Sequence, residues 1–186
     1  MAAAAARAGP GRPVAGVTID LVDDAAVVAR QLGRSPRAFR RVVVRCPYGR
    51  PAVTEQAPYT PDGEPFPTTY YMTCPHLVAA ISRIEAAGGV ERWSAASEAD
   101  PVLAASRKAA DEEQRASRRA LVGEELGKDG GASLELGVGG SRPGGGGLKC
   151  LHAHAAYALA RPGYVLGERI LAEVEPLWPT DGCCTA

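Results

Sequence analysis

The stretch Lys149–Ala160 reads KCLHAHAAYALA and follows a segment rich in glycine. Its alanines and leucines favour a helix that is apolar on most faces, and an Arg-Pro-Gly sequence at 161–163 ends it. Cys150, His152 and His154 lie near the start of this helix. Thiolates and imidazoles ligate metals and also act as nucleophiles and bases, so the helix start is the first candidate for a functional site.

Two further cysteines, Cys46 and Cys74, are each followed by proline, and each ends a run of β-branched and apolar residues. Such runs predict three strands, at residues 41–46, 52–56 and 68–73. The connections between them are rich in proline and glycine, so we expect a three-stranded antiparallel sheet. If the first and third strands leave the sheet at the same edge, Cys46 and Cys74 are neighbours.

The apolar residues outside these strands recur at helical spacing and predict about five helices. We expect these helices at residues 24–32, 75–87, 100–121, 149–160 and 167–174, with a short helical turn at 91–96. A small antiparallel sheet packed with helices defines an α+β fold.

The length of 186 residues suits one domain with irregular ends. We expect a disordered tail at 1–16, a single α+β domain at 17–175 and a second tail at 176–186. Within the domain, residues 123–147 contain eleven glycines and predict a flexible loop or an active-site flap. The proline-rich loop 58–67 is expected to be ordered, with Phe66 buried and the loop close to Cys74.

Charge and hydropathy argue against several classes of function. Lys plus Arg and Asp plus Glu both total 21, and this neutral balance gives no reason to expect nucleic acid or an anionic membrane as a partner. No apolar run is long enough to predict a membrane span. Five cysteines without an export signal favour the cytoplasm, where thiols more often bind metal, react or pack than form disulfides.

The cysteines and histidines predict a metal site formed by Cys46, Cys74 and Cys150, with His152 or His154 as the fourth ligand. Three thiolates and one imidazole are a common zinc set, and three thiolates can also hold an iron–sulfur cluster. The chain has no Cys-x-x-Cys pair, and isolated cysteines are often just small buried apolar residues, so simple packing remains the alternative.

Three functions from different classes are compatible with the sequence. The first is a metal-binding module whose metal stabilises the fold. The second is an enzyme that uses thiolate or metal chemistry on a small molecule under the glycine-rich segment. The third is an adaptor that binds a protein through the long charged helix at 100–121 and needs no metal. Whether the protein is an enzyme, and what its partner or substrate is, stay open at this point.

Four segments, in order, are characteristic: RCPYGRPAV, DGEPFPTTYYMTCPHL, ISRIEAAGGV and KCLHAHAAYALA. Over about residues 20–171 the chain resembles the bacterial domain of unknown function 501 family, which is typical of actinobacteria. The resemblance implies a small cytosolic protein without an established activity, substrate or cofactor. It carries Cys46, Cys150 and His152 over as family residues. The family often has a histidine where this chain has Tyr157, and His154 is placed to fill that gap.

Overall fold

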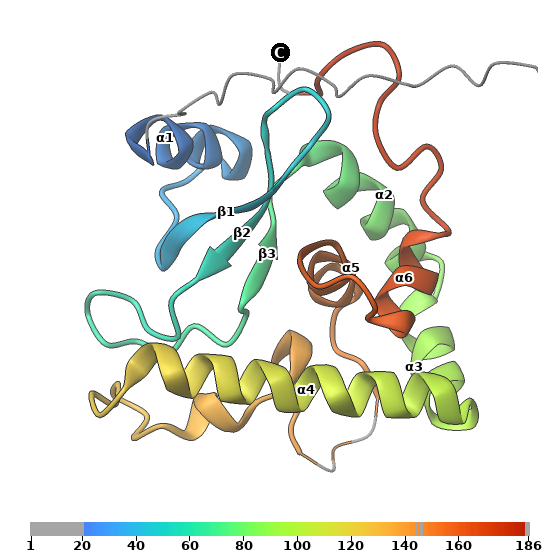
Figure 1. The fold of residues 1–186 in the computed structure, drawn as a ribbon. Coiled ribbons are helices and arrows are strands. Elements are labelled where there is room, and N and C mark those ends of the chain that lie inside the picture. The colour runs from blue at the N-terminus through green and yellow to red at the C-terminus, as the bar shows by residue number, and fades with distance from the viewer. Residues whose placement is uncertain (1–20, 144, 146, 185–186) are drawn as a thin grey trace, which may run out of the picture.

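The computed structural model describes residues 21–143, 145 and 147–184. The tail expected at 1–16 lies outside the described residues. The described chain forms a three-stranded antiparallel sheet and six α-helices, which confirms the predicted α+β class (Figure 1). Within the described residues, no helix combines the length and the apolarity that crossing a bilayer requires.

The sheet has the order β1-β2-β3, with β1 at Phe39–Arg45, β2 at Pro51–Gln56 and β3 at Tyr70–Met72. Every residue of the central strand β2 is buried. β3 is shorter than the predicted strand at 68–73, because it begins only at Tyr70 and the chain turns toward α2 (Pro75–Ala86) soon after Met72. The amides of Thr73 and Cys74 both donate to the carbonyl of Ala52, and α2 begins at the next residue.

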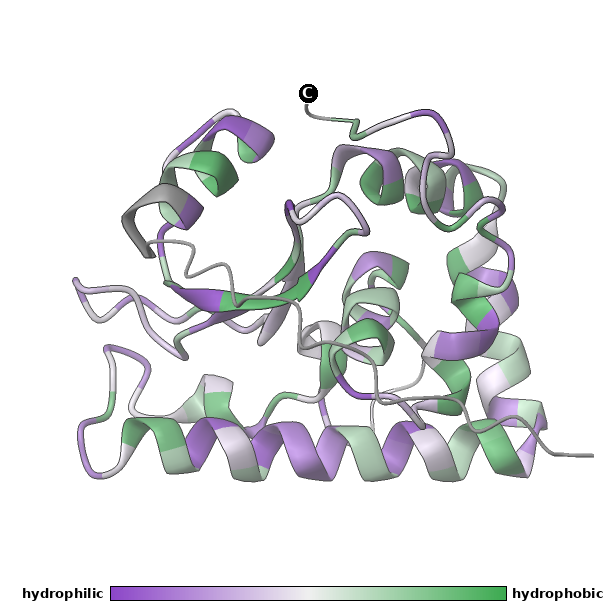
Figure 2. Cartoon of the chain, turned by 45° about the horizontal axis from the view of Figure 1, so that its top comes forward, coloured by the Kyte–Doolittle hydropathy of each residue, from purple (hydrophilic) through white to green (hydrophobic). Residues whose placement is uncertain are grey.

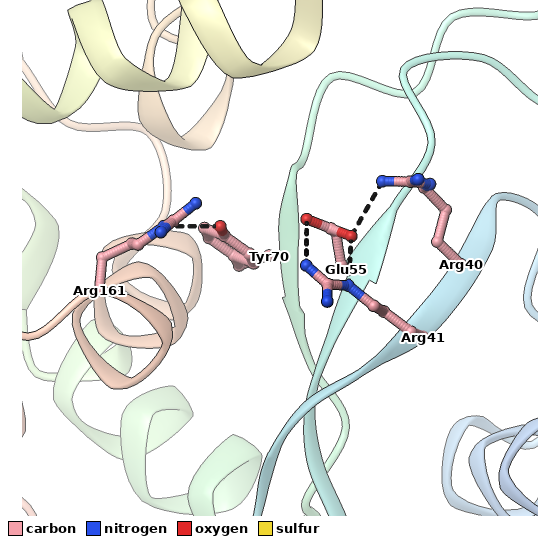
Figure 3. A network of polar contacts seen from close by, with 5 residues as sticks. All are labelled: Arg40, Arg41, Glu55, Tyr70 and Arg161. Atoms are coloured by element: carbon pink, nitrogen blue, oxygen red, sulfur yellow. Dashed lines mark hydrogen bonds and ion pairs between the residues drawn. The ribbon is translucent and has the colours of Figure 1, made fainter. Parts of the chain in front are cut away.

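A buried carboxylate ties β1 to β2. Glu55 accepts hydrogen bonds from Nη1 of Arg40 at 2.9 Å and Nε of Arg41 at 2.8 Å (Figure 3). Consecutive residues of a strand normally point to opposite faces, but β1 shifts register just before Arg41, and this irregularity lets both guanidinium groups reach one carboxylate. Beside this cluster, Arg161 donates to the hydroxyl of Tyr70 at 2.9 Å and so joins the end of α5 to β3.

Helix α5 (Leu151–Ala160) lies at the centre of the molecule, between β3, α2 and α6 (Val165–Leu171) (Figure 1). Seven of its ten residues are buried, and five of those seven are small or apolar alanine and leucine side chains. Because alanine has so small a side chain, neighbouring elements can approach α5 closely on several sides. The stretch that the sequence singled out is therefore the core helix of the fold.

Helices α3 and α4 follow α2 with almost no connection. The helical turn predicted at 91–96 is a complete helix, α3 (Gly89–Ala99). Gly88 has φ of 78°, a left-handed conformation that suits glycine and separates α2 from α3. Asp100 then caps α4 (Pro101–Val122) by accepting the amide of Val102 at 2.8 Å. α1 (Leu21–Leu32) packs beside the sheet, where Asp24 pairs with Arg45 at 2.7 Å.

The glycine-rich segment packs against α4. It contains two short 3-10 helices, Ala132–Glu135 and Val138–Gly140, where the sequence alone predicted only loop. Leu134 and Val138 are buried, and Asp111 of α4 accepts the amide of Val138 at 2.7 Å. α4 carries polar residues along much of its length (Figure 2), yet its inner side supports this segment and the core. It is therefore not a freely solvated helix.

The C-terminal residues also return to the core. Tyr48 donates its hydroxyl hydrogen to the carbonyl of Pro179 at 2.6 Å, and His76 lies 2.9 Å from the carbonyl of Pro176. Leu177 and Trp178 pack against the buried cluster.

In the loop at 58–67, the expected burial of Phe66 is met only in part. Its side chain is half-buried, with its ring centroid 6.2 Å from that of Tyr71.

Candidate metal centre

Glu85, Cys150 and His152 meet where α2 passes the start of α5. Nδ1 of His152 lies 3.2 Å from Oε1 of Glu85 and 3.8 Å from Sγ of Cys150. In the part of the chain that the structure describes, these residues form the only set of three Cys, His, Asp or Glu side chains whose ligand atoms all lie within 4.8 Å of one another. One carboxylate, one thiol and one imidazole thus converge on one point.

Glu85 is held in place by the backbone of α5. The residue before that helix, Cys150, is extended and makes no side-chain cap. Instead, Oε1 of Glu85 accepts the amide hydrogen of Leu151 at 2.6 Å. The first amides of a helix have no partner within the helix and favour a nearby negative charge, so α5 itself fixes the carboxylate beside the thiol.

His152 is oriented from its far side by α2. Its Nε2 lies 3.1 Å from the carbonyl oxygen of Val78 and 3.3 Å from Oγ of Ser82. Because a carbonyl oxygen can only accept, the contact with Val78 places a hydrogen on Nε2. Nδ1 is then turned toward Cys150 and Glu85. Metal-ligating histidines usually donate their other N–H in this way, which fixes the tautomer and the ring orientation.

The electrostatics of the cluster favour a positive charge at Nδ1. Burial by itself lowers the pKa of His152, but the Cys150 thiol, the Glu85 carboxylate and the Val78 carbonyl outweigh burial and raise this pKa to about 9. At neutral pH and without a metal, Nδ1 therefore carries a proton between a thiol and a carboxylate. A divalent cation at this point would replace that proton and meet the same three partners.

A cavity of about 320 Å³ opens beside the cluster. Its walls come from β3, α2, α5 and the second 3-10 helix. Its lining includes Tyr70, Tyr71, Met72, Val78, Ser82, Gly139, Cys150, His152 and Ala153. The lining is more apolar than polar, and two of the three converging side chains face it. A small molecule in this cavity would lie directly against Cys150 and His152.

Cys46 and Cys74 lie outside this cluster, and the expected convergence of three thiols is not found among the described residues. Both are buried, but Cys74 sits at the beginning of α2 and Glu85 eleven residues further on. At about 1.5 Å per residue, the two positions lie roughly 16 Å apart along the helix. Cys150 lies beside Glu85, far from Cys74. Sγ of Cys74 instead lies 3.5 Å from Sγ of Cys184.

His154 also lies outside the cluster. Its ring is completely buried, and Nδ1 lies 2.6 Å from the hydroxyl of Tyr164 in the segment before α6. Burial lowers the pKa of His154 to about 3, so the ring is neutral. Tyr157 is a packed residue: its hydroxyl contacts the carbonyl of Ala110 at 3.2 Å and Glu113 at 3.0 Å.

Glu85 was not predicted as a site residue. It is the only acidic residue of α2. Val78, Ser82 and Glu85 follow one another at helical spacing, so they share a face of α2 that meets His152. A lone acid within a helix is a usable signal, but nothing in the sequence connects it with residues 150–152.

The comparisons with known proteins give one match. The family model described as "Protein of unknown function (DUF501)" matches residues 42–172, which is more than half of the chain. This range contains all three residues of the cluster and every residue that lines the cavity, but it ends before the C-terminal residues 173–186. No curated protein and no solved structure gives a significant match.

Proposed function

Because the chain belongs to the DUF501 family of proteins of unknown function, we propose its function from the site alone: the protein binds one zinc ion and uses it on a small molecule. Glu85, Cys150 and His152 are the proposed ligands. The observation that carries the proposal is the approach of these three ligand atoms to within 4.8 Å of one another. The hydrogen bond that fixes the outer nitrogen of His152 supports it.

The ligand set favours zinc over an iron–sulfur cluster. Zinc is bound by thiolate, imidazole and carboxylate, all of which are present, and these ligands lie about 2.0–2.3 Å from the metal. Iron–sulfur clusters are held mainly by cysteine thiolates, and only one thiol belongs to this set. Cys46, Cys74, Cys150 and Cys184 are free thiols, which supports a reducing compartment and, within this proposal, the cytoplasm.

Three protein ligands favour a chemical role for the metal. Structural zinc sites are usually closed by four protein ligands, whereas catalytic sites keep a position for water or substrate. Here the cavity of about 320 Å³ adjoins two of the three ligands. We therefore place the open position on the cavity side. A metal there would act as a Lewis acid on a bound small molecule or on a water molecule.

A second candidate function is thiol catalysis without metal. Nδ1 of His152 faces both the thiol of Cys150 and the carboxylate of Glu85, while the carbonyl of Val78 holds Nε2. The thiol, the imidazole and the Val78 carbonyl thus resemble a nucleophile, a base and the group that orients the base. In this case the sulfur of Cys150 would attack an electrophilic substrate in the same cavity. Both candidates use the same residues, and metal content distinguishes them.

Elemental analysis of protein purified without oxygen tests the proposal. We expect about one zinc per chain in the wild type, and a loss of zinc in Glu85→Gln, Cys150→Ser and His152→Gln. Matched controls that should keep zinc are Glu91→Gln, Cys183→Ser and His76→Gln, which change the same residue types elsewhere. Circular dichroism would confirm that each variant is folded.

Zinc that survives all three cluster substitutions would contradict the proposed ligands. A wild type that contains no zinc and takes up none in a titration would overturn the metal function. In that case, if the thiol candidate is correct, iodoacetamide should alkylate Cys150 faster than Cys183. The alkylation of Cys150 should be markedly slower in His152→Gln.

A further inference from the structure

A second pair of reactive side chains lies away from the candidate centre, where the C-terminal residues meet the start of α2. Sγ of Cys74 and Sγ of Cys184 are 3.5 Å apart, although the two residues are separated by 110 positions. Both are free thiols. Among the described residues, no third Cys, His, Asp or Glu joins this pair as a ligand group. The geometry suits a bond between the two sulfurs rather than a metal site.

Several independent contacts bring the C-terminal residues to this place. The hydroxyl of Tyr48 donates to the carbonyl of Pro179 at 2.6 Å, and His76, in the first turn of α2, lies 2.9 Å from the carbonyl of Pro176. Leu177 and Trp178 pack against the core. The approach of the two sulfurs is therefore one contact of a docked segment and not an isolated encounter.

The two thiols differ in accessibility, and the difference assigns them different roles. Cys184 is exposed, so an oxidant in solution can reach it. Cys74 is 2% exposed and is shielded from direct attack. Burial also raises the pKa of the Cys74 thiol to about 11, which disfavours its thiolate as the first species to react. An exposed cysteine beside a second, protected one is a typical arrangement for sulfenic acid formation followed by disulfide formation.

We propose that Cys184 and Cys74 form a redox-modification site in which hydrogen peroxide oxidises Cys184 and Cys74 resolves the product. In the first step, the sulfur of Cys184 takes one oxygen from the peroxide, giving a sulfenic acid and one water. In the second step, the sulfur of Cys74 displaces the hydroxyl group of that sulfenic acid, giving the disulfide and a second water. Two thiols thus lose two electrons, and one peroxide becomes two water molecules.

The disulfide fastens the C-terminal segment to α2. The carbonyl of Cys74 accepts the amide hydrogen of Val78 at 2.9 Å, and the carbonyl of Val78 in turn orients His152. The modification site is thereby connected by one helical turn to the candidate centre, but it does not depend on the proposed zinc. A bridge that closes a loop of this length stabilises a fold chiefly by restricting the unfolded chain.

Stepwise oxidation of the full-length protein with hydrogen peroxide tests the inference. We expect the intact mass to fall by two hydrogens, non-reducing peptide maps to join Cys74 to Cys184, and Tm to rise by about 5–10 °C. Dithiothreitol should reverse all three changes. One tryptic peptide contains both Cys46 and Cys74, and another contains both Cys183 and Cys184, so a peptide map alone does not identify the bonded cysteine in each peptide. Cys46→Ser and Cys183→Ser are therefore the matched controls, and both should still form the bridge.

Cys74→Ser and Cys184→Ser should both lose the bridge, but the products of their oxidation should differ. In Cys74→Ser the sulfenic acid at Cys184 persists and should be trapped by dimedone. In Cys184→Ser no bridge to Cys74 forms and Tm no longer rises. A bridge between Cys183 and Cys184, a disulfide between two chains, or a loss of the bridge in Cys183→Ser would overturn the inference.

Discussion

At the scale of single residues, the surroundings of His152 keep its side chain charged at neutral pH. Its pKa rises from the ordinary histidine value of 6.5 to about 9. A group with a raised pKa in the folded state stabilises the protein fully below its unfolded value and loses this contribution as pH rises through the folded value.

We therefore expect the metal-free protein to lose stability between about pH 6.5 and pH 9, by at most about 3 kcal/mol. Urea unfolding in the presence of a chelator, at several pH values across this window, measures the effect. His152→Gln removes the titrating group and should flatten this part of the profile. Equal slopes in the wild type and in His152→Gln would show that other groups cause the pH dependence.

Arg118 is a second residue with an unusual environment. Its side chain is completely buried in α4, and none of its three guanidinium nitrogens has a hydrogen-bond partner among the described residues. Burial lowers its pKa to about 10, which the nearby Tyr59 and Asp129 oppose only in part. Arg118 thus remains charged at neutral pH in a place that solvates it poorly.

Arg118→Met should leave stability unchanged or raise it by about 1–3 kcal/mol, because methionine keeps an apolar side chain of similar length and removes the buried charge. The midpoint of urea unfolding measures this difference. Arg119→Met is the control, because the neighbouring arginine is exposed and pairs with Glu135. A clear loss of stability in Arg118→Met alone would mean that its guanidinium has an acceptor beyond the described residues.

At the scale of elements, the packing of α6 on α5 depends on one glycine. A Cβ atom at Gly167 would lie 2.5 Å from the carbonyl oxygen of His154 and 2.7 Å from Cβ of Ala158. In an exposed helix, replacing glycine by alanine stabilises by about 1 kcal/mol. At this position the steric conflict with the carbonyl oxygen of His154 reverses the sign of the effect, since a backbone carbonyl cannot rotate away as a side chain can.

Gly167→Ala is accordingly expected to destabilise the fold by roughly 2–3 kcal/mol, despite the better helix propensity of alanine. Chemical denaturation compares it with the wild type. Ala105→Gly, at an exposed position of α4, is the control for helix propensity alone. It should lower the free energy of unfolding by about 1 kcal/mol. If Gly167→Ala is as stable as the wild type, α5 and α6 pack less tightly than the structure indicates.

The sequence predicts elements better than the contacts between them. The alanine-rich pattern at 149–160 and the β-branched runs correctly indicate α5 and the sheet, because local propensity and apolar spacing decide these elements. His152 was identified from its chemistry. Glu85 was missed because the point along α2 that meets the start of α5 depends on tertiary packing. Cys184 was missed because the path of the last residues depends on tertiary packing too, and neither has a local sequence signature.

At the scale of the whole molecule, the C-terminal residues belong to the packed structure. The sequence predicted a tail at 176–186. In the structure, Leu177 and Trp178 contact the core, and Pro176 and Pro179 accept hydrogen bonds from two distant elements. The segment covers the edge where the first turn of α2 meets the β1–β2 turn.

Deleting residues 176–186 should therefore lower the stability of the remaining chain, although none of the described helices and strands lies in this range. The partly buried side chains of Leu177 and Trp178 suggest a loss of about 2–4 kcal/mol, because burial of apolar surface is the main contribution of this segment. Thermal unfolding under reducing conditions measures it without any contribution from a disulfide. Trp178→Ala in the full-length chain should account for a large part of the loss, whereas Tyr48→Phe removes one hydrogen bond to the segment and should cost only about 1 kcal/mol. A truncated protein with the Tm of the wild type would show that the segment contacts the core without stabilising it.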